Sequence, residues 1–262
     1  MSGSRTGACS AALCSTALTA LTALTTLAAL ALCPAGATAA PADDTGSLSA
    51  DQLARRSHDA LLSARSLHVT AQGDLGSGAG TSFDLTLDRS GNCRGSVSLG
   101  PQGSVEIIRR GTDVWIKPNA AFWKNEVPGG GSALASLVGD RYLKGTTNDP
   151  VLRNTTDVCD LDTFQKYLDT SAKLPATDLT KGRPTTVDGV AAIPVTATRQ
   201  GRTYTLDVAA SGKPYPVRFT VARGPAAPDA TVRFGGFDQP VPTATPAAAD
   251  AVDITGLMSK QS

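Results

Sequence analysis

The sequence offers few residues whose type and spacing could support chemistry. The best candidate is Gly91-Asn92-Cys93-Arg94-Gly95, which has the G-x-C-x-G form of a nucleophile elbow with cysteine. Such an elbow needs a turn from a strand into a helix, and a base beside the nucleophile. Here the residues that follow alternate between apolar and polar, which predicts a strand, and neither histidine has an obvious route to the cysteine. The segment is therefore interpreted as a strand start that carries half of a disulfide.

The other candidate sites have equally plain interpretations. The glycine-rich segment 76–80 resembles a phosphate-binding loop, but such a loop opens a helix and this one precedes a strand, so a hairpin turn is expected. His58 and His68 lack metal-ligand spacing and are expected to be structural or at the surface. Asp160 and Asp162 stand at the start of a predicted helix, which favours a cap and a dipole partner over a catalytic pair. The sequence thus gives no support for an enzyme, and neither a cofactor nor a metal is expected.

Length and charge narrow the class of protein. The 262 residues allow one ordinary domain or two small ones, and 41% hydrophobic residues suffice for a packed core. The chain has 24 basic and 23 acidic residues, so no basic excess is available to hold a phosphate backbone, and no nucleic-acid partner is expected. The 26 glycines and 16 prolines indicate many turns, as in a β-rich fold.

The amino-terminal segment predicts export. No charged residue lies between Arg5 and Asp43, and residues 11–33 consist mainly of Leu, Ala and Thr, as in the apolar core of a signal peptide. Ala37-Thr38-Ala39 suits a signal peptidase, so residues 1–39 are expected to be removed and the product secreted. Two alternatives remain: an uncut membrane span over 11–33, for which about 20 residues suffice, and lipidation at Cys33, although bulky Leu32 suits a lipoprotein signal poorly. All three place the rest of the chain in the extracytoplasmic cell envelope or outside the cell.

Two cysteines remain after residue 39, Cys93 and Cys159. An even pair in an exported protein most simply forms a disulfide, and two free thiols are the alternative. The bridge would close a loop of roughly 67 residues, which the chain-entropy model values at about 4 kcal/mol.

Periodicity predicts an α+β fold in one domain. Residues 40–48 are expected to be a flexible leader, 49–257 the domain and 258–262 a tail. A capping box of Ser49 and Gln52 predicts a helix over 49–65. A period of two then predicts about five short strands between 67 and 117, and about six more at 177–181, 184–187, 190–199, 202–210, 215–223 and 229–237. Residues 118–170 lack this alternation and predict short helices at 120–123, 132–138 and 160–168.

About eleven antiparallel strands make a sheet that must curl, because strands twist. The apolar concave face of a curled sheet needs a cover, which either the helices or a ligand can provide.

Several sequence segments and their order along the chain resemble the actinobacterial cell-envelope proteins of the LppX/LprG type, which belong to the LolA-like superfamily. They are "SLHVT" at 66–70, "GTDVWIKPNAAFW" at 111–123, "TTVDGVAAIPV" at 185–195 and "SGKPYPVRFTV" at 211–221. The resemblance implies a curled antiparallel half-barrel with helices over its concave face, and an apolar cavity that holds an acylated lipid or lipoprotein. This sequence departs from the family in its poor lipoprotein signal and in the Cys93/Cys159 pair.

The residues expected to line this ligand cavity are apolar positions of the two strand blocks and of the helical insert between them. They are Phe83, Leu85, Leu87, Val97, Val105, Ile107, Val114, Ile116, Phe122, Trp123, Leu134, Leu137, Val138, Val195, Tyr204, Leu206, Val208, Val217, Phe219 and Phe234.

Three hypotheses for function follow. The first is a monomeric, non-enzymatic carrier that contacts membrane surfaces transiently. The second is an extracytoplasmic regulatory or sensor protein of the same fold, and the third is a structural envelope protein with a filled core and no ligand.

Overall fold

The computed structural model describes residues 45–74, 80–126, 129, 131–149, 152, 156–171, 178–225 and 227–255. The predicted signal peptide 1–39 with Cys33, the first part of the leader, most of the turn at 76–80 and the tail 258–262 lie outside these residues. Within them, no helix combines the length and the apolar character that a bilayer crossing requires.

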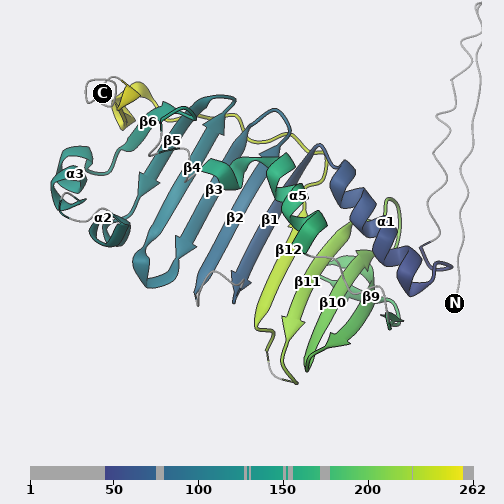
Figure 1. Ribbon diagram of the computed structural model, residues 1–262. Coiled ribbons are helices and arrows are strands. Elements are labelled where there is room, and N and C mark those ends of the chain that lie inside the picture. The colour runs from purple at the N-terminus through teal and green to yellow at the C-terminus, as the bar shows by residue number, and fades with distance from the viewer. Residues whose placement is uncertain are drawn as a thin grey trace, which may run out of the picture. The chain divides into compact units, whose positions relative to one another are not determined.

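Thirteen strands form one curled sheet that does not close (Figure 1). Its order is β13-β6-β5-β4-β3-β2-β1-β12-β11-β10-β9-β7, with β8 paired to β9 beside this path. Neighbours are antiparallel except β13 and β6, so the sheet is mixed. The strands are β1 Ser66–Gly73, β2 Thr81–Asp88, β3 Cys93–Leu99, β4 Ser104–Arg110, β5 Asp113–Pro118, β6 Tyr142–Thr146, β7 Thr180–Lys181, β8 Thr185–Val187, β9 Val190–Arg199, β10 Arg202–Ala209, β11 Pro216–Ala222, β12 Ala230–Gly235 and β13 Ala251–Asp253.

The predicted α+β half-barrel is confirmed, with thirteen strands in place of about eleven. The missed strand β6 lies inside the stretch predicted to be without strands. It is only five residues long, and its buried positions are Leu143 and Gly145, so a single large apolar residue marks the strand in the sequence. Its pairing with β5 creates it, which is a tertiary effect.

In the described part of the chain, the α-helices with given bounds are α1 Ala50–Ser63, α2 Ala120–Glu126, α3 Gly131–Val138 and α5 Leu161–Ser171. The capping box of α1 is confirmed, because the Gln52 amide donates to Ser49 Oγ (3.2 Å) and the Ser49 amide donates to Gln52 Oε1 (3.0 Å). Leu53 of α1 is fully buried against Ile193, Val195 and Val208 of β9 and β10. The first helix is thereby fixed to the concave face (Figure 1).

Residues 45–48, which the sequence assigns to the leader, are tied to the domain. Thr45 is fully buried and its hydroxyl donates to the carbonyl of Ala210. Lys181 Nζ donates to the carbonyls of Gly46 (2.6 Å) and Leu48 (2.7 Å).

The predicted hairpin between β9 and β10 is also confirmed. Gln200 (φ 52°) and Gly201 (φ 73°) both have positive φ, which is the two-residue turn whose twist matches that of the flanking strands. This turn fixes the register and places Arg199 directly opposite Arg202.

After β12 the chain crosses the convex face toward β13. Arg94 Nη1 donates to the Ala244 carbonyl (3.1 Å) and Arg110 Nε to the Thr243 carbonyl (3.3 Å). Ile108 and Trp115 lie in register with Arg94 on this face, and both are buried. The crossing segment therefore shields part of the convex side.

The disulfide between Cys93 and Cys159 is confirmed, with a Cα–Cα distance of 5.5 Å. It joins the start of β3 to the short helical turn Asp157–Cys159 that precedes α5, and both cysteines are fully buried. The bridge thus fastens the start of α5 to the centre of the sheet.

We expect the double substitution Cys93→Ser/Cys159→Ser to lower the free energy of unfolding by about 3–4 kcal/mol, because the unfolded chain regains the freedom of a long loop. Urea denaturation measures this loss. Thiol labelling of the denatured, unreduced wild-type protein serves as the control, and labelling of both Cys93 and Cys159 would contradict the pairing.

Candidate functional site: the apolar concave face

Apolar side chains form one continuous row across the concave face. Cross-strand register aligns nine strands, from β5 through β4, β3, β2, β1, β12, β11 and β10 to β9. The members in that order are Pro118, Val105, Val97, Phe83, Ala71, Val232, Phe219, Leu206 and Val195. With strands about 4.8 Å apart, the row extends for about 38 Å along the sheet.

Beside this row, toward α1 and α5, the concave face is a closed core. Leu67, Leu87, Ile107, Leu161 and the disulfide cysteines are all at most 1% exposed and belong to one cluster. Leu61 of α1 joins the same cluster, and Figure 1 shows α1 and α5 lying over one end of the strands. The helices therefore cover only part of the apolar surface.

The remaining part of the face is half-buried and apolar, and we call it the open apolar face. Its members lie on β2, β3, β10, β11 and β12, and each is neither fully buried nor fully exposed. They are Phe83, Val97, Tyr204, Leu206, Phe219, Val221, Val232 and Phe234. The rings of Tyr204 and Phe219 lie 6.3 Å apart, which confirms that these two side chains share one side of the sheet.

The predicted cavity residues separate into groups in the structure. One group is buried in the main core cluster and consists of Leu85, Leu87, Val105, Ile107, Val114, Ile116, Trp123 and Val138. A second group, Val195 and Val208, is buried in the cluster beneath α1. Phe83, Val97, Tyr204, Leu206, Phe219 and Phe234 belong to the open apolar face, and Phe122 of α2 packs at the edge of the main cluster.

Three predicted residues lie elsewhere. Leu134 and Leu137 of α3 are 41% and 62% exposed, so they line no interior. Val217 is the extra residue of a β-bulge, because Asp207 pairs with Arg218 and the next residue, Val208, pairs with Pro216. The bulge turns Val217 into a separate cluster with Val187 and Ala192, which simple alternation cannot anticipate.

The prediction also missed members of the concave face. Val221 and Val232 complete the open apolar face, and Val69 and Leu143 are buried in the main cluster. The alternation of Val232 with Phe234 was visible in the sequence, whereas Leu143 depended on recognising β6.

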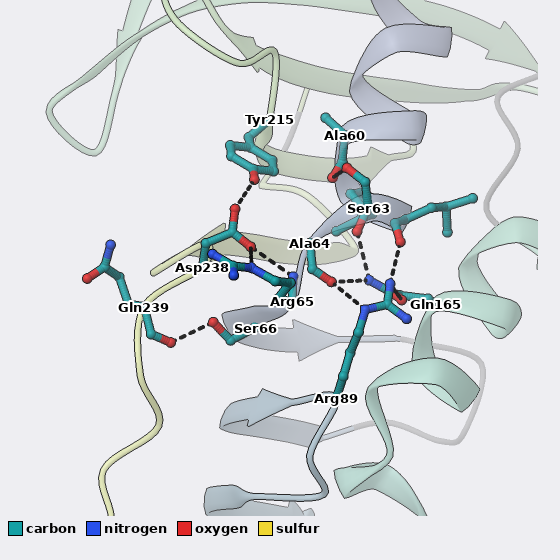
Figure 2. A network of polar contacts seen from close by, with 12 residues as sticks. Ala60, Ser63, Ala64, Arg65, Ser66, Arg89, Gln165, Tyr215, Asp238 and Gln239 are labelled. Atoms are coloured by element: carbon teal, nitrogen blue, oxygen red, sulfur yellow. Dashed lines mark hydrogen bonds and ion pairs between the residues drawn. The ribbon is translucent and has the colours of Figure 1, made fainter. Parts of the chain in front are cut away.

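The helix cover is held at the carboxyl end of α1 by Arg89 and Gln165 (Figure 2). Arg89 Nε donates to the Ala64 carbonyl (3.1 Å) and Nη2 to the Leu62 carbonyl (2.6 Å). Gln165 of α5 donates from Nε2 to the carbonyls of Leu61 (2.8 Å) and Ala64 (3.2 Å). The last carbonyls of a helix have no partner within it, so these side chains satisfy groups that would otherwise need water.

The same arginine joins the two helices to the sheet. Arg89 follows β2 directly, its Nη2 donates to Gln165 Oε1 (2.8 Å), and its Nη1 donates to Asp162 of α5. Asp162 is thus an ion-pair partner in the first turn of α5. Asp160 caps the helix, because the Thr163 amide donates to its Oδ1 (2.7 Å), and this hydrogen bond lowers the pKa of Asp160. The cap predicted for Asp160 is confirmed, and Asp162 stands in the first turn of α5 as predicted.

A second set of contacts in Figure 2 ties the start of β1 to the chain after β12. The Arg65 amide donates to Asp238 Oδ1 (2.8 Å) and the Tyr215 hydroxyl to Asp238 Oδ2 (2.6 Å). These hydrogen bonds, that of Tyr215 first, lower the pKa of Asp238. The hydroxyl of Ser66 also donates to the Gln239 carbonyl (2.5 Å). The start of β1 is therefore fixed to the chain segment that follows β12.

Two hollows of the described chain are lined mainly by polar residues, although Ala71 and Phe83 of the apolar row also line one of them. One of about 280 Å³ lies between the turns that follow β2 and β4 and the start of α5, lined by Arg89, Arg109, Asp160 and others. Another of about 230 Å³ is lined mainly by polar convex-face residues that include Ser82, Ser96 and Ser98. Near it, His68 Nε2 lies 2.8 Å from Asp84 Oδ1, so this histidine has a hydrogen-bonding partner at the surface.

We expect Arg89→Gln to lower the free energy of unfolding by about 1–2 kcal/mol, because the carbonyls at the end of α1 lose charged donors that are partly exposed to solvent. Thermal denaturation measures the change. Arg55→Gln is the matched control, since Arg55 is an exposed arginine whose ion pair with Asp51 lies within α1. Equal stability of the two variants would show that Arg89 does not hold the cover.

The chain is similar to several solved structures. No protein-family model matches the sequence, and no curated protein matches it either. LprF from Mycobacterium bovis aligns with 76% of this chain and 97% of its own, at a TM-score of 0.49 and 16% identity. The Mycobacterium tuberculosis lipoprotein LppX aligns with 74% of this chain and 97% of its own, at 0.44 and 15%.

The complex of MucA and MucB from Pseudomonas aeruginosa also matches, over 76% of this chain and 59% of the other, at a TM-score of 0.31 and 12% identity. LppX, one of the structures matched, is of the LppX/LprG type that the sequence segments resemble.

Proposed function

We propose that this chain is an exported, non-enzymatic binding protein of the cell envelope that holds the acyl chains of a lipid or lipoprotein on its open apolar face. In this proposal residues 1–39 direct export and are removed, and the domain that begins near residue 49 carries the ligand through the aqueous envelope.

The observation that carries the proposal is the continuous apolar row, which runs from the buried core into half-exposed positions. A sheet that served only as a scaffold would gain stability by covering these side chains, because each buried methylene is worth about 0.8 kcal/mol. Large apolar patches left open on a protein usually mark a binding surface. An acyl chain that binds along the row would remove from water both its own apolar surface and that of the side chains in the row.

The shape of the surface also favours a chain-like ligand. Phe83, Ala71, Val232 and Phe219 follow one another on the adjacent strands β2, β1, β12 and β11, so the apolar surface is long and narrow. The strand face carries no charged residue within the row itself, and polar side chains of the same strands, such as Asp84 and Arg233, alternate to the convex side. A flexible hydrocarbon matches this pattern better than a compact polar molecule does.

A transient contact with a membrane belongs to the same proposal. Leu134 and Leu137 lie one turn apart on α3 and are among the exposed large apolar residues of the described chain. Lys124 of α2 is exposed, and α2 and α3 pack on one another. An apolar helix surface near a basic residue suits the boundary between lipid headgroups and acyl chains.

We expect Phe219→Ser/Val232→Ser to weaken binding of a fluorescent fatty acid about tenfold, because the row loses apolar contact at its centre. The melting temperature should fall by only a few degrees, since both side chains are already partly exposed. Val190→Ser is the control, because Val190 is a 43% exposed apolar residue that lies outside the row. Unchanged binding by the double variant would refute the proposed site.

We expect Leu134→Ser/Leu137→Ser to slow transfer of a fluorescent lipid between phosphatidylcholine vesicles several-fold, with unchanged affinity at equilibrium. The reason is that α3 contacts the membrane but not the bound chain. Vesicle-to-vesicle transfer monitored by energy transfer measures the rate. Equal rates in the variant and the wild type would remove α3 from the mechanism.

A further inference from the structure

The end of the sheet beside the open apolar face carries a row of arginines. Arg199 of β9 and Arg202 of β10 are directly opposed in register. Arg199 lies two residues from Ala197, and Arg202 lies two residues from Tyr204. Ala197 and Tyr204 are also directly opposed and belong to the concave side, so the two arginines lie on that side as well. Directly opposed side chains have Cβ atoms about 4.5–5.5 Å apart. The two arginine side chains therefore leave the backbone next to each other, on the same face as the apolar row.

Arg223 extends this row. Thr203 pairs with Ala222, so Arg223, one residue beyond the end of β11, is the next position beside Arg202. Arg223 is balanced, because its Nε lies 3.4 Å from Asp229 Oδ2. In the part of the chain that the structure describes, neither Arg199 nor Arg202 has an ion pair or a hydrogen bond from its side chain.

Like charges directly opposite one another destabilise a sheet. The type I′ turn at Gln200-Gly201 nevertheless fixes these two arginines in that arrangement. Arginine binds phosphate and carboxylate through paired N–H donors, and an anion between the two groups would remove their repulsion. On the same side of β10, Arg202 is followed two residues later by Tyr204, a member of the open apolar face.

We propose that Arg199 and Arg202 bind the anionic headgroup, a phosphate or carboxylate, of a lipid whose acyl chains lie on the open apolar face. This inference rests on the proposed function and makes it more specific, because it assigns the ligand an anionic headgroup and a direction. The headgroup lies at the β9–β10 hairpin, and the acyl chains run from there across β10, β11 and β12.

The test compares fluorescent phosphatidylglycerol with phosphatidylcholine of the same acyl chains, on the whole mature protein at low ionic strength. The wild type should bind the anionic lipid about tenfold more tightly, and this preference should shrink at high salt, because the arginines are exposed and screened. Arg199→Gln/Arg202→Gln should abolish the preference and weaken phosphatidylcholine binding much less than phosphatidylglycerol binding, because the choline cation of phosphatidylcholine offsets its phosphate. Its melting temperature should be equal to or higher than that of the wild type, because a repulsion is removed.

Arg183→Gln/Arg233→Gln is the matched control, since it removes the same charge from a loop and from the convex side of β12 and should keep the preference. Glycerol phosphate, which has no acyl chain, should compete only weakly.

Equal affinity for both lipids in the wild type, or an unaltered preference in the arginine variant, would overturn the headgroup site while leaving the carrier proposal intact. Strong competition by glycerol phosphate would mark a site for free phosphate esters and would also overturn it. Failure of the wild type to bind either lipid would refute the proposed function itself.

Discussion

The cover over the concave face depends on the carboxyl end of α1, where Arg89 and Gln165 supply donors to the carbonyls of Leu61, Leu62 and Ala64. A helix end that packs on a sheet must find partners for these groups, because unsatisfied buried carbonyls are costly. Arg89 comes from the end of β2 and Gln165 from α5. One cluster of hydrogen bonds therefore fixes two helices and the sheet relative to one another.

The disulfide adds a second attachment at the same end of the strands. Cys93 begins β3, and Cys159 precedes α5, whose own first turn is capped by Asp160 and paired with Arg89 through Asp162. Both attachments act where the core is fully buried. None of the contacts in these two groups reaches the open apolar face, so the covered and open parts of the concave side have different physical roles.

This division explains how one sheet can be stable and still present apolar surface. The buried part supplies the hydrophobic stabilisation, with residues such as Leu87 and Ile107 removed from solvent. The open part, with Phe83 and Phe219 half-exposed, contributes less to folding and is available to a ligand. A substitution in the buried part should therefore act on stability, and one in the open part on binding.

The sequence by itself determined the strands with a clear period of two, the capping box of α1, the hairpin at Gln200-Gly201 and the pairing of Cys93 with Cys159. Each of these depends on local chemistry or on a count of cysteines. The tertiary structure alone decided that β6 is a strand, that Val217 turns away at a bulge, that Leu134 and Leu137 face solvent, and that Arg199 and Arg202 flank the apolar row. These features arise from pairing between strands and from the limited reach of the helices, which a pattern along one chain does not contain.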